Sequence, residues 1–118
     1  PIEKPVVILS GGEVEIKLPD CCGIGGRNSQ FSLELAKEIQ GMEGVTALSA
    51  DTDGIDGIGK NAGAIVDGSS YQIIRQHYED VDPVELCDSF NIHRNAHTLF
   101  STGPTGINLN DFRAVIVR

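Results

Sequence analysis

Short apolar runs that end directly in glycine clusters recur along this chain. Eleven of its 14 glycines fall in four clusters, at 11–12, 23–26, 54–63 and 103–106. Three clusters follow a predicted strand, and the fourth precedes the clearest predicted helix. The glycines have no Gly-X-Y period and the apolar fraction is an ordinary 40%, so collagen-like and disordered chains are excluded. We therefore expect one compact domain with several glycine loops.

The clearest helix begins at Arg27, where apolar residues return with a period of 3.6. Its predicted apolar face consists of Phe31, Leu35, Ala36 and Ile39. Gly41 follows as a stop signal. Two shorter helices are expected, one capped by Ser69 or Ser70 and ending near 79, the other with Asp82 as its cap and Pro83 in its first turn, through 87.

Strand patterns alternate with these helices. The expected strands cover residues 5–10, 13–18, 45–50, 98–102 and 112–117. The segment 62–66 is too short to assign. The alternation predicts an α/β layered domain over 1–118, with a mixed, mostly parallel sheet flanked by helices.

Net charge limits the partners. Seventeen acidic residues oppose nine basic ones, which gives a net charge of −8 and repels nucleic acids and anionic membranes. No apolar run approaches the ~20 residues of a membrane span and no leader pattern is present, so a cytoplasmic location is the default. The chain starts at Pro1 and is short for a two-substrate enzyme, so we treat it as a candidate piece of a longer protein.

The clearest anion-site candidate is the segment Gly25-Gly26-Arg27-Asn28. A helix start presents unbonded N–H groups and a positive dipole end, and glycines let a ligand approach the backbone closely. Arg27 adds a planar fork suited to phosphate or carboxylate. The alternative is a solvated Arg27 beside a capping Asn28.

The loop at 51–57 carries three carboxylates within six residues. Asp51, Asp53 and Asp56 repel one another unless a cation or a proton offsets them. Mg²⁺ uses one or two carboxylates together with substrate phosphates, so Asp51 and Asp53 are the candidate metal ligands. The alternative is a turn in which aspartate side chains bond their own backbone.

Two nucleotide-binding patterns occur here in imperfect form. The stretch 54–60 resembles a P-loop, but Asn61 replaces the hydroxyl residue. The stretch 57–62 resembles a dinucleotide fingerprint, but it follows an acidic loop instead of a strand.

The last glycine cluster leads to Asn108 and Asn110, and with Thr105 it offers hydroxyl and amide donors to a small hydroxy acid or phosphate. This segment is equally well interpreted as a turn that is stabilised by its own hydrogen bonds. His93 and His97 stand at i, i+4 without a clear third ligand, which favours packing or surface roles.

Five ordered blocks of this sequence together resemble one family. They are 8–13 (ILSGGE), 25–28 (GGRN), 49–57 (SADTDGIDG), 62–68 (AGAIVDG) and 102–111 (TGPTGINLND). They are similar to the C-terminal MOFRL domain of class II glycerate kinases, the glycerate 2-kinase family, and the resemblance spans nearly the whole chain.

The resemblance implies phosphorylation of D-glycerate to 2-phosphoglycerate with ATP and Mg²⁺, in a cleft shared with a larger N-terminal kinase domain that this chain lacks. It places the catalytic arginine on Arg27 and the catalytic aspartate on Asp53. The residues expected to bind substrate and phosphate are Gly25, Gly26, Asn28, Thr52, Gly54, Thr105 and Asn108. The isolated domain is expected to be inactive, because the N-terminal domain, which contributes a lysine to the family's active site, is absent from it.

The sequence departs from the family at Ser29-Gln30, where Gln-Glu is usual, and at 91–97. Two other functions stay open: an oxidoreductase of the hydroxypyruvate reductase type, and a freestanding anion- or metabolite-binding domain without catalysis. The oligomeric state also stays open, a homo-oligomer included.

Overall fold

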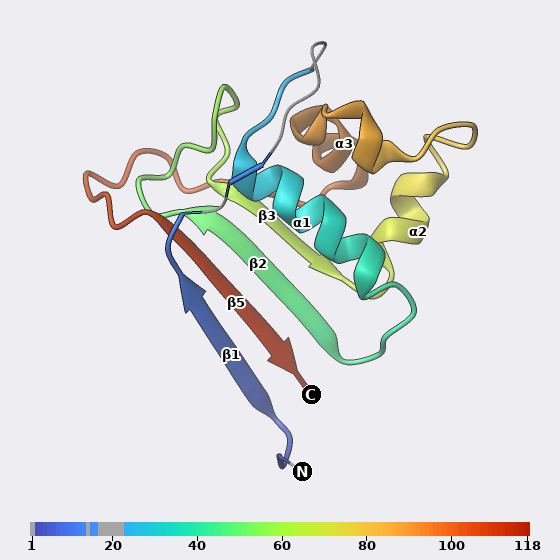
Figure 1. Ribbon diagram of the computed structural model, residues 1–118, viewed down its shortest axis with the longest axis horizontal. Coiled ribbons are helices and arrows are strands. Elements are labelled where there is room, and N and C mark those ends of the chain that lie inside the picture. Colours follow the sequence, from blue (N-terminus) through green and yellow to red (C-terminus); the bar gives the residue numbers. More distant parts are fainter. Residues whose placement is uncertain (1, 14, 17–22) are drawn as a thin grey trace.

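A five-stranded sheet forms the centre of the computed structural model, which describes residues 2–13, 15–16 and 23–118 (Figure 1). The strand order is β1-β5-β2-β3-β4. The strands are β1 (Val6–Gly11), β2 (Val45–Asp51), β3 (Gly63–Asp67), β4 (Leu99–Phe100) and β5 (Asp111–Val117). The helices are α1 (Arg27–Glu38), α2 (Ser70–Arg75), the 3₁₀ helix η1 (Pro83–Leu86) and α3 (Ser89–Ala96).

The sheet is antiparallel at every strand pair, so the predicted mostly parallel sheet is wrong. Strands β1 and β2 do run in the same direction, with α1 as the crossover between them, as the alternating pattern suggested. The last strand, β5, inserts between them and pairs antiparallel with both: Val115 lies opposite Ile8 on one side and Ala47 on the other. Local sequence patterns carry no information about that insertion.

Several element boundaries also differ from the prediction. Strand β3, in the segment left unassigned, pairs with both β2 and β4, and α3 was not predicted at all. Helix α2 ends at Arg75 instead of near 79, and Ser69 at its N-cap makes no capping bond. The strand expected at 13–18 falls partly outside the described residues, and 13, 15 and 16 are not in a strand.

The start of η1 follows the prediction. Asp82 is its N-cap and accepts a hydrogen bond from the backbone N–H of Val84 at 3.1 Å, with Pro83 in the first turn. The element is a 3₁₀ helix of four residues, and Cys87 closes it in the left-handed conformation.

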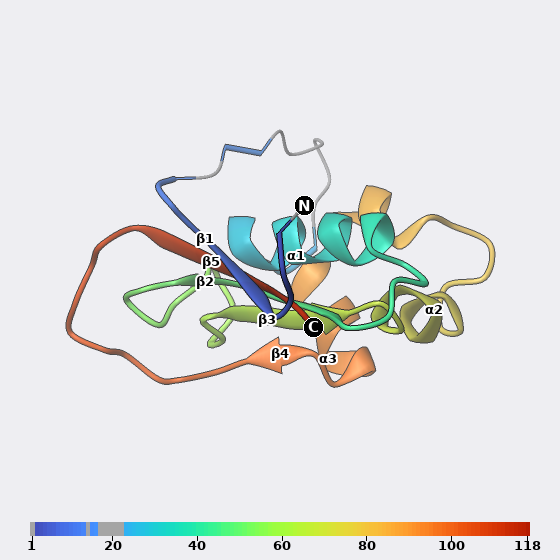
Figure 2. The same cartoon turned by 90° about the horizontal axis from the view of Figure 1, so that it is seen from below.

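Helix α1 packs across β2 and β3 on one side of the sheet (Figure 2). Two apolar clusters hold these layers together. They consist of Ala36, Ile39, Ala47, Val66 and Tyr71, and of Leu33, Ile74 and Ile92. Burying a leucine, isoleucine or valine side chain in such a cluster contributes about 1.5–3 kcal/mol. None of the helices in the described part of the chain is long and apolar enough to cross a membrane.

The buried face of α1 is less apolar than predicted. Phe31 and Leu35 are only partly buried, while Leu33 is completely buried. The first two turns instead bury four polar residues, which are Asn28, Ser29, Gln30 and Ser32. The amino-terminal half of α1 is therefore held by hydrogen bonds, and it is this half that borders the candidate site.

The glycine loops come together at one edge of the sheet. Strand β2 ends at the edge where β5 begins, with Asp51 opposite Asp111, and β1 ends there with Gly11 opposite Phe112. The loops after β1, β2 and β4 and the start of α1 thus meet at one edge, although the sheet is antiparallel.

Candidate functional site

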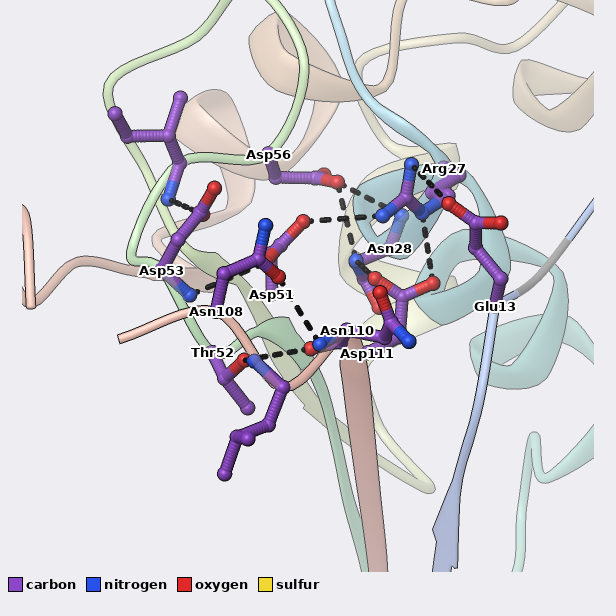
Figure 3. A network of polar contacts seen from close by, with 12 residues as sticks. Glu13, Arg27, Asn28, Asp51, Thr52, Asp53, Asp56, Asn108, Asn110 and Asp111 are labelled. Carbon is purple, nitrogen blue, oxygen red and sulfur yellow. Dashed lines mark hydrogen bonds and ion pairs between the residues drawn. The ribbon is translucent and has the colours of Figure 1, made fainter. Parts of the chain in front are cut away.

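Arg27, the first residue of α1, binds carboxylates from two neighbouring strands (Figure 3). Its Nε donates to Oδ2 of Asp111 at 2.7 Å, and one terminal nitrogen donates to Oδ2 of Asp51 at 3.1 Å. The other terminal nitrogen lies 3.7 Å from a carboxylate oxygen of Glu13, in the loop after β1. These contacts fix the plane of the guanidinium and leave the Arg27 side chain 33% exposed.

The electrostatics keep this guanidinium charged. The hydrogen bond to Asp111 is the largest cause of a raised pKa for Arg27, and the negative charges of Asp111, Asp51 and Glu13 add to it. Burial is the largest cause of a raised pKa for Asp51, and the nearby charges of Asp53 and Asp111 act in the same direction. The site is thus a cation set among closely spaced carboxylates.

Asn28 lies completely buried beneath Arg27. Its side-chain amide donates to Oδ1 of Asp111 at 2.8 Å and to Oδ1 of Asp56 at 3.3 Å, and its carbonyl oxygen accepts from Ser49 Oγ at 2.7 Å. Asn28 therefore connects the two buried carboxylates through its own side chain.

The start of α1 is capped from a distant loop. The N-cap residue, Gly26, has no side chain to offer, and Asp56 takes its place by accepting from the backbone N–H of Asn28 at 2.9 Å and of Ser29 at 2.7 Å. Two of the N–H groups at the helix start that were predicted to be open to an external anion are thus bonded to a carboxylate of the protein itself.

The loop after β2 forms two local aspartate turns. Oδ1 of Asp51 accepts from the backbone N–H of Asp53 at 3.1 Å, and Oδ1 of Asp53 accepts from the N–H of Ile55 at 2.8 Å. This is the arrangement that the turn interpretation of the loop described. It leaves Asp53, at the tip of the first turn, beside the carboxylate that binds Arg27.

The carboxylates do not form a complete metal site by themselves. Within the described residues, no group of three or more His, Cys, Asp and Glu is arranged to hold a metal ion. The two oxygens of Asp51 already contact Arg27 and the N–H of Asp53. A cation at this edge would therefore need the phosphates of a bound substrate as further ligands.

The loops at 51–57 and 103–111 are tied together by hydroxyl groups. The Thr52 hydroxyl donates to the carbonyl of Asn110 at 2.8 Å and accepts from the N–H of Leu109 at 2.7 Å, while the Thr105 hydroxyl donates to the carbonyl of Thr52 at 2.5 Å. Asn108 accepts from the N–H of Asn110 at 3.1 Å. Thr52, Thr105 and Asn108, all predicted substrate contacts, thus shape these loops.

The close approach of the same two loops explains why residue 54 is a glycine. Its φ is +88°, and a Cβ atom there would lie 2.1 Å from the carbonyl oxygen of Gly103. Only glycine fits this junction without displacing the neighbouring loop.

A pocket of about 310 Å³ opens next to Arg27, at the start of α1. Its described lining includes two predicted ligand-binding glycines, Gly25 and Gly26, along with Gln30 and Ile58. The pocket is large enough for a three-carbon acid or for one end of a nucleotide.

Neither imperfect nucleotide pattern has the required surroundings. The stretch 54–62 lies in the loop between β2 and β3 and leads into a strand, whereas a P-loop and a dinucleotide fingerprint both lead into a helix.

Several important residues were not predicted from sequence. Asp111 and Asp56 were not predicted as site residues, and Ser29 and Asn61 were noted only as departures from known motifs. Asn61 donates to Ser29 Oγ at 2.9 Å. The signal for Asp56 lay in Gly26, an N-cap without a side chain, which implies a cap from elsewhere in the chain.

His93 packs behind the same helix turn. It is completely buried, its Nε2 donates to the carbonyl of Ser29 at 2.8 Å, and its Nδ1 lies 2.7 Å from the Thr98 hydroxyl. Burial lowers its pKa to about 4, so the ring is neutral at pH 7. His97 ends α3 in the left-handed conformation.

Comparisons with known proteins agree on one family. The model of the MOFRL family matches residues 6–111. A D-glycerate 2-kinase of Thermotoga maritima is 41% identical over 94% of this chain and 27% of its own length. A putative hydroxypyruvate reductase of Agrobacterium vitis is 44% identical over 99% of this chain and 31% of its own length.

Solved structures show the same relationship. The crystal structure of a glycerate kinase from Thermotoga maritima superposes with a TM-score of 0.92 at 39% identity and covers 100% of this chain and 28% of that one. A protein of Pyrococcus horikoshii gives a TM-score of 0.89 at 36% identity. The chain thus spans less than one third of the length of these relatives.

Proposed function

The chain belongs to the MOFRL family, and from this premise we propose that it forms one side of the active site of a glycerate 2-kinase. In this proposal the rest of the same protein, an N-terminal kinase domain, supplies the other side. The reaction is the transfer of the γ-phosphoryl group of ATP to the 2-hydroxyl of D-glycerate.

The observation that carries the proposal is the position of Arg27. Its guanidinium is oriented by Asp111 and Asp51, remains one-third exposed and borders a pocket at the edge where the glycine loops meet. Phosphoryl transfer depends on positioning and on stabilising charge that develops on the transferred oxygens. A guanidinium that is permanently charged and already held in orientation suits that task.

Asp53 is the proposed partner of Arg27 in the reaction. As the hydroxyl oxygen of glycerate bonds to the γ-phosphorus and the bond to the leaving ADP oxygen breaks, the hydroxyl proton must leave. The carboxylate of Asp53 would orient this hydroxyl and accept the proton. Gly25 and Gly26 border the pocket in which the substrate would lie. Thr52, Gly54, Thr105 and Asn108 would keep the loops at 51–57 and 103–111 in shape. Neither these four residues nor Asp53 belong to the described lining of the pocket, so the substrate would have to reach from the pocket to the loop that bears Asp53.

ATP and Mg²⁺ belong to the proposal because relatives are named glycerate kinases. The residues fit a shared cation better than a resident one, since Asp53 can offer a carboxylate while phosphates complete the ligand set. When bound, Mg²⁺ supplies charge neutralisation of the phosphate oxygens.

The test uses the whole protein that contains this chain. We expect it to convert D-glycerate and ATP to 2-phosphoglycerate and ADP in the presence of Mg²⁺, measured by coupled ADP release and by identification of the phosphorylated carbon. Absence of this product with an intact, folded protein would contradict the proposal. Glycerate binding without turnover would instead favour a binding domain.

A second candidate is reduction of hydroxypyruvate, because two relatives at 41% and 44% identity are named putative hydroxypyruvate reductases. The loop at 54–62 lacks the strand-to-helix surroundings of a dinucleotide fingerprint, which argues against a nicotinamide site in the described residues. Hydroxypyruvate-dependent oxidation of NADH by the whole protein would favour this function.

A further inference from the structure

We propose that Asp56 is a positioning residue that fastens the loop bearing Asp53 to the start of α1 and so fixes Asp53 relative to Arg27. This inference rests on the function proposed above for Arg27 and Asp53. In this proposal Asp56 does not contact the substrate. Its effect is transmitted through the backbone and through Asn28.

The contacts of Asp56 are those of a helix cap supplied by a distant loop. Oδ1 accepts from the Asn28 N–H at 2.9 Å and Oδ2 accepts from the Ser29 N–H at 2.7 Å. Oδ2 also accepts from the Ser29 hydroxyl at 2.6 Å. Asp56 is 1% exposed, so these bonds are made away from water, where charge-assisted hydrogen bonds are strong.

The fastening reaches both proposed reacting groups. Asp53 stands three residues before Asp56 in one loop, and Arg27 directly precedes the two capped N–H groups. The Asn28 amide adds a second connection, because it bonds to Asp56 at 3.3 Å and to Asp111 at 2.8 Å, and Asp111 binds Arg27. A shift of Asp56 would thus move the loop and the guanidinium relative to each other.

The loop around Asp56 is itself closed. The Asp56 N–H donates to the carbonyl of Asn61 at 2.8 Å, and the Asn61 amide donates to the Ser29 hydroxyl and to the carbonyl of Gly63, both at 2.9 Å. The base of the loop is therefore joined to β3 and to α1, and cannot move independently of the helix start.

Two glycines make this approach possible. A Cβ atom on Gly26 would lie 2.4 Å from the Cγ of Asp56, and one on Gly57 would lie 2.4 Å from the carbonyl oxygen of Gly25. The absence of a side chain at these two glycines allows the loop and the helix start to lie in contact. In this arrangement the N–H groups of Asn28 and Ser29 are not available to phosphate, so Arg27 offers its side chain as the anion-binding group of this turn.

The experiment compares Asp56→Asn with Asp82→Asn in the whole protein. Both aspartates cap a helix, but Asp82 caps η1 and pairs with Lys37 in the last turn of α1, roughly 15 Å along the helix from Arg27. Asparagine at 56 keeps the size of the side chain and turns one acceptor oxygen into a donor that faces the donors of Asn28 and Ser29.

We expect Asp56→Asn to lower kcat on the order of 10²-fold, as a small misplacement of reacting groups does, at a temperature where the variant is fully folded. Asp82→Asn should lower the melting temperature and keep kcat. If both variants lose melting temperature and both keep kcat, Asp56 is a structural cap and the inference is overturned.

Hydrogen exchange gives a readout that does not depend on activity. In Asp56→Asn, the N–H groups of the first turn of α1 and those of the loop at 52–57 should exchange faster together, and in Asp82→Asn neither should change. Faster exchange at the helix start alone would overturn the inference. Absence of kinase activity in the wild-type protein would defeat the proposed function, while this exchange pattern would still decide whether Asp56 fastens loop to helix.

Discussion

The Nε atom of Arg27 donates a 2.7 Å hydrogen bond to a carboxylate oxygen of Asp111, whose side chain is completely shielded from solvent. Asp111 opens β5, the strand that separates β1 from β2, and lies opposite Asp51 across the sheet. The insertion of β5 therefore places a second carboxylate beside the one at the end of β2. Arg27 bridges both, and the strand order of the sheet determines the orientation of its guanidinium.

The substitution Asp111→Asn tests this orientation. It removes the buried charge and places an amide donor against Arg27 or Asn28, both of which donate to Asp111. We expect a loss of about 1–3 kcal/mol in the free energy of unfolding, because a buried donor loses its acceptor. In the whole protein kcat should fall as well. Unchanged urea midpoint and unchanged kcat would contradict the assignment.

The substitution Arg27→Lys tests the proposed role of the fork. Lysine keeps the positive charge but cannot bond to Asp111 and Asp51 with a planar set of donors. We expect kcat of the whole protein to fall by roughly 10²–10³-fold, as when a preorientated donor to a developing anion is lost. Steady-state rates of ADP release provide the measurement. Arg75→Lys is the matched control, because Arg75 bonds to backbone carbonyls in the loop after α2. Equal losses in both variants would argue for a general effect on folding.

Much of the local structure follows from sequence because it depends on neighbouring residues. The helix start at Arg27, the cap at Asp82 and the strands β1, β2 and β5 all have local signals. The sheet direction has none, since it depends on where the last strand inserts.

The residues of the candidate site also divide into those with local sequence signals and those that depend on distant parts of the chain. Arg27 and Asp51 lie at element ends that periodicity can locate, and the structure brings them together. Asp56 and Asp111 act across 27 to 84 residues of sequence, and a buried carboxylate looks like any loop aspartate until its partners are known.

The loop junction predicts a difference between two glycines of similar conformation. Gly54 and Gly106 both have positive φ, +88° and +75°, but a Cβ atom on Gly54 would meet the carbonyl oxygen of Gly103 at 2.1 Å while one on Gly106 meets nothing within 4 Å. Gly106→Ala should therefore cost only the backbone strain, about 1 kcal/mol, and Gly54→Ala clearly more. Thermal unfolding of the two variants makes the comparison. Equal shifts in melting temperature would show that the loops separate freely.

His93 predicts a pH dependence of stability. Burial lowers the pKa of the folded protein's His93 to about 4 from its ordinary value of 6.5, so between these values the unfolded chain binds more protons than the folded one. The contribution of His93 to the free energy of unfolding should then be fully present above pH 6.5 and should decrease as the pH drops toward 4. Below pH 4 this group should cause no further loss. Each pKa unit corresponds to about 1.4 kcal/mol, so the total loss is on the order of 3 kcal/mol.

The substitution His93→Gln isolates this contribution. Glutamine does not titrate and can still donate to the carbonyl of Ser29, which His93 bonds at 2.8 Å. We expect the variant to be less stable than the wild type at pH 7, because its shape fits the site less well. The difference should shrink as the pH falls from 6.5 to 4, because only the wild type must suppress protonation of a buried ring. Urea denaturation across this range measures the difference, with His77→Gln at an exposed histidine as the control. A wild-type-to-variant difference that is constant between pH 4 and pH 6.5 would mean that the His93 ring accepts its proton as readily in the folded protein as in the unfolded chain.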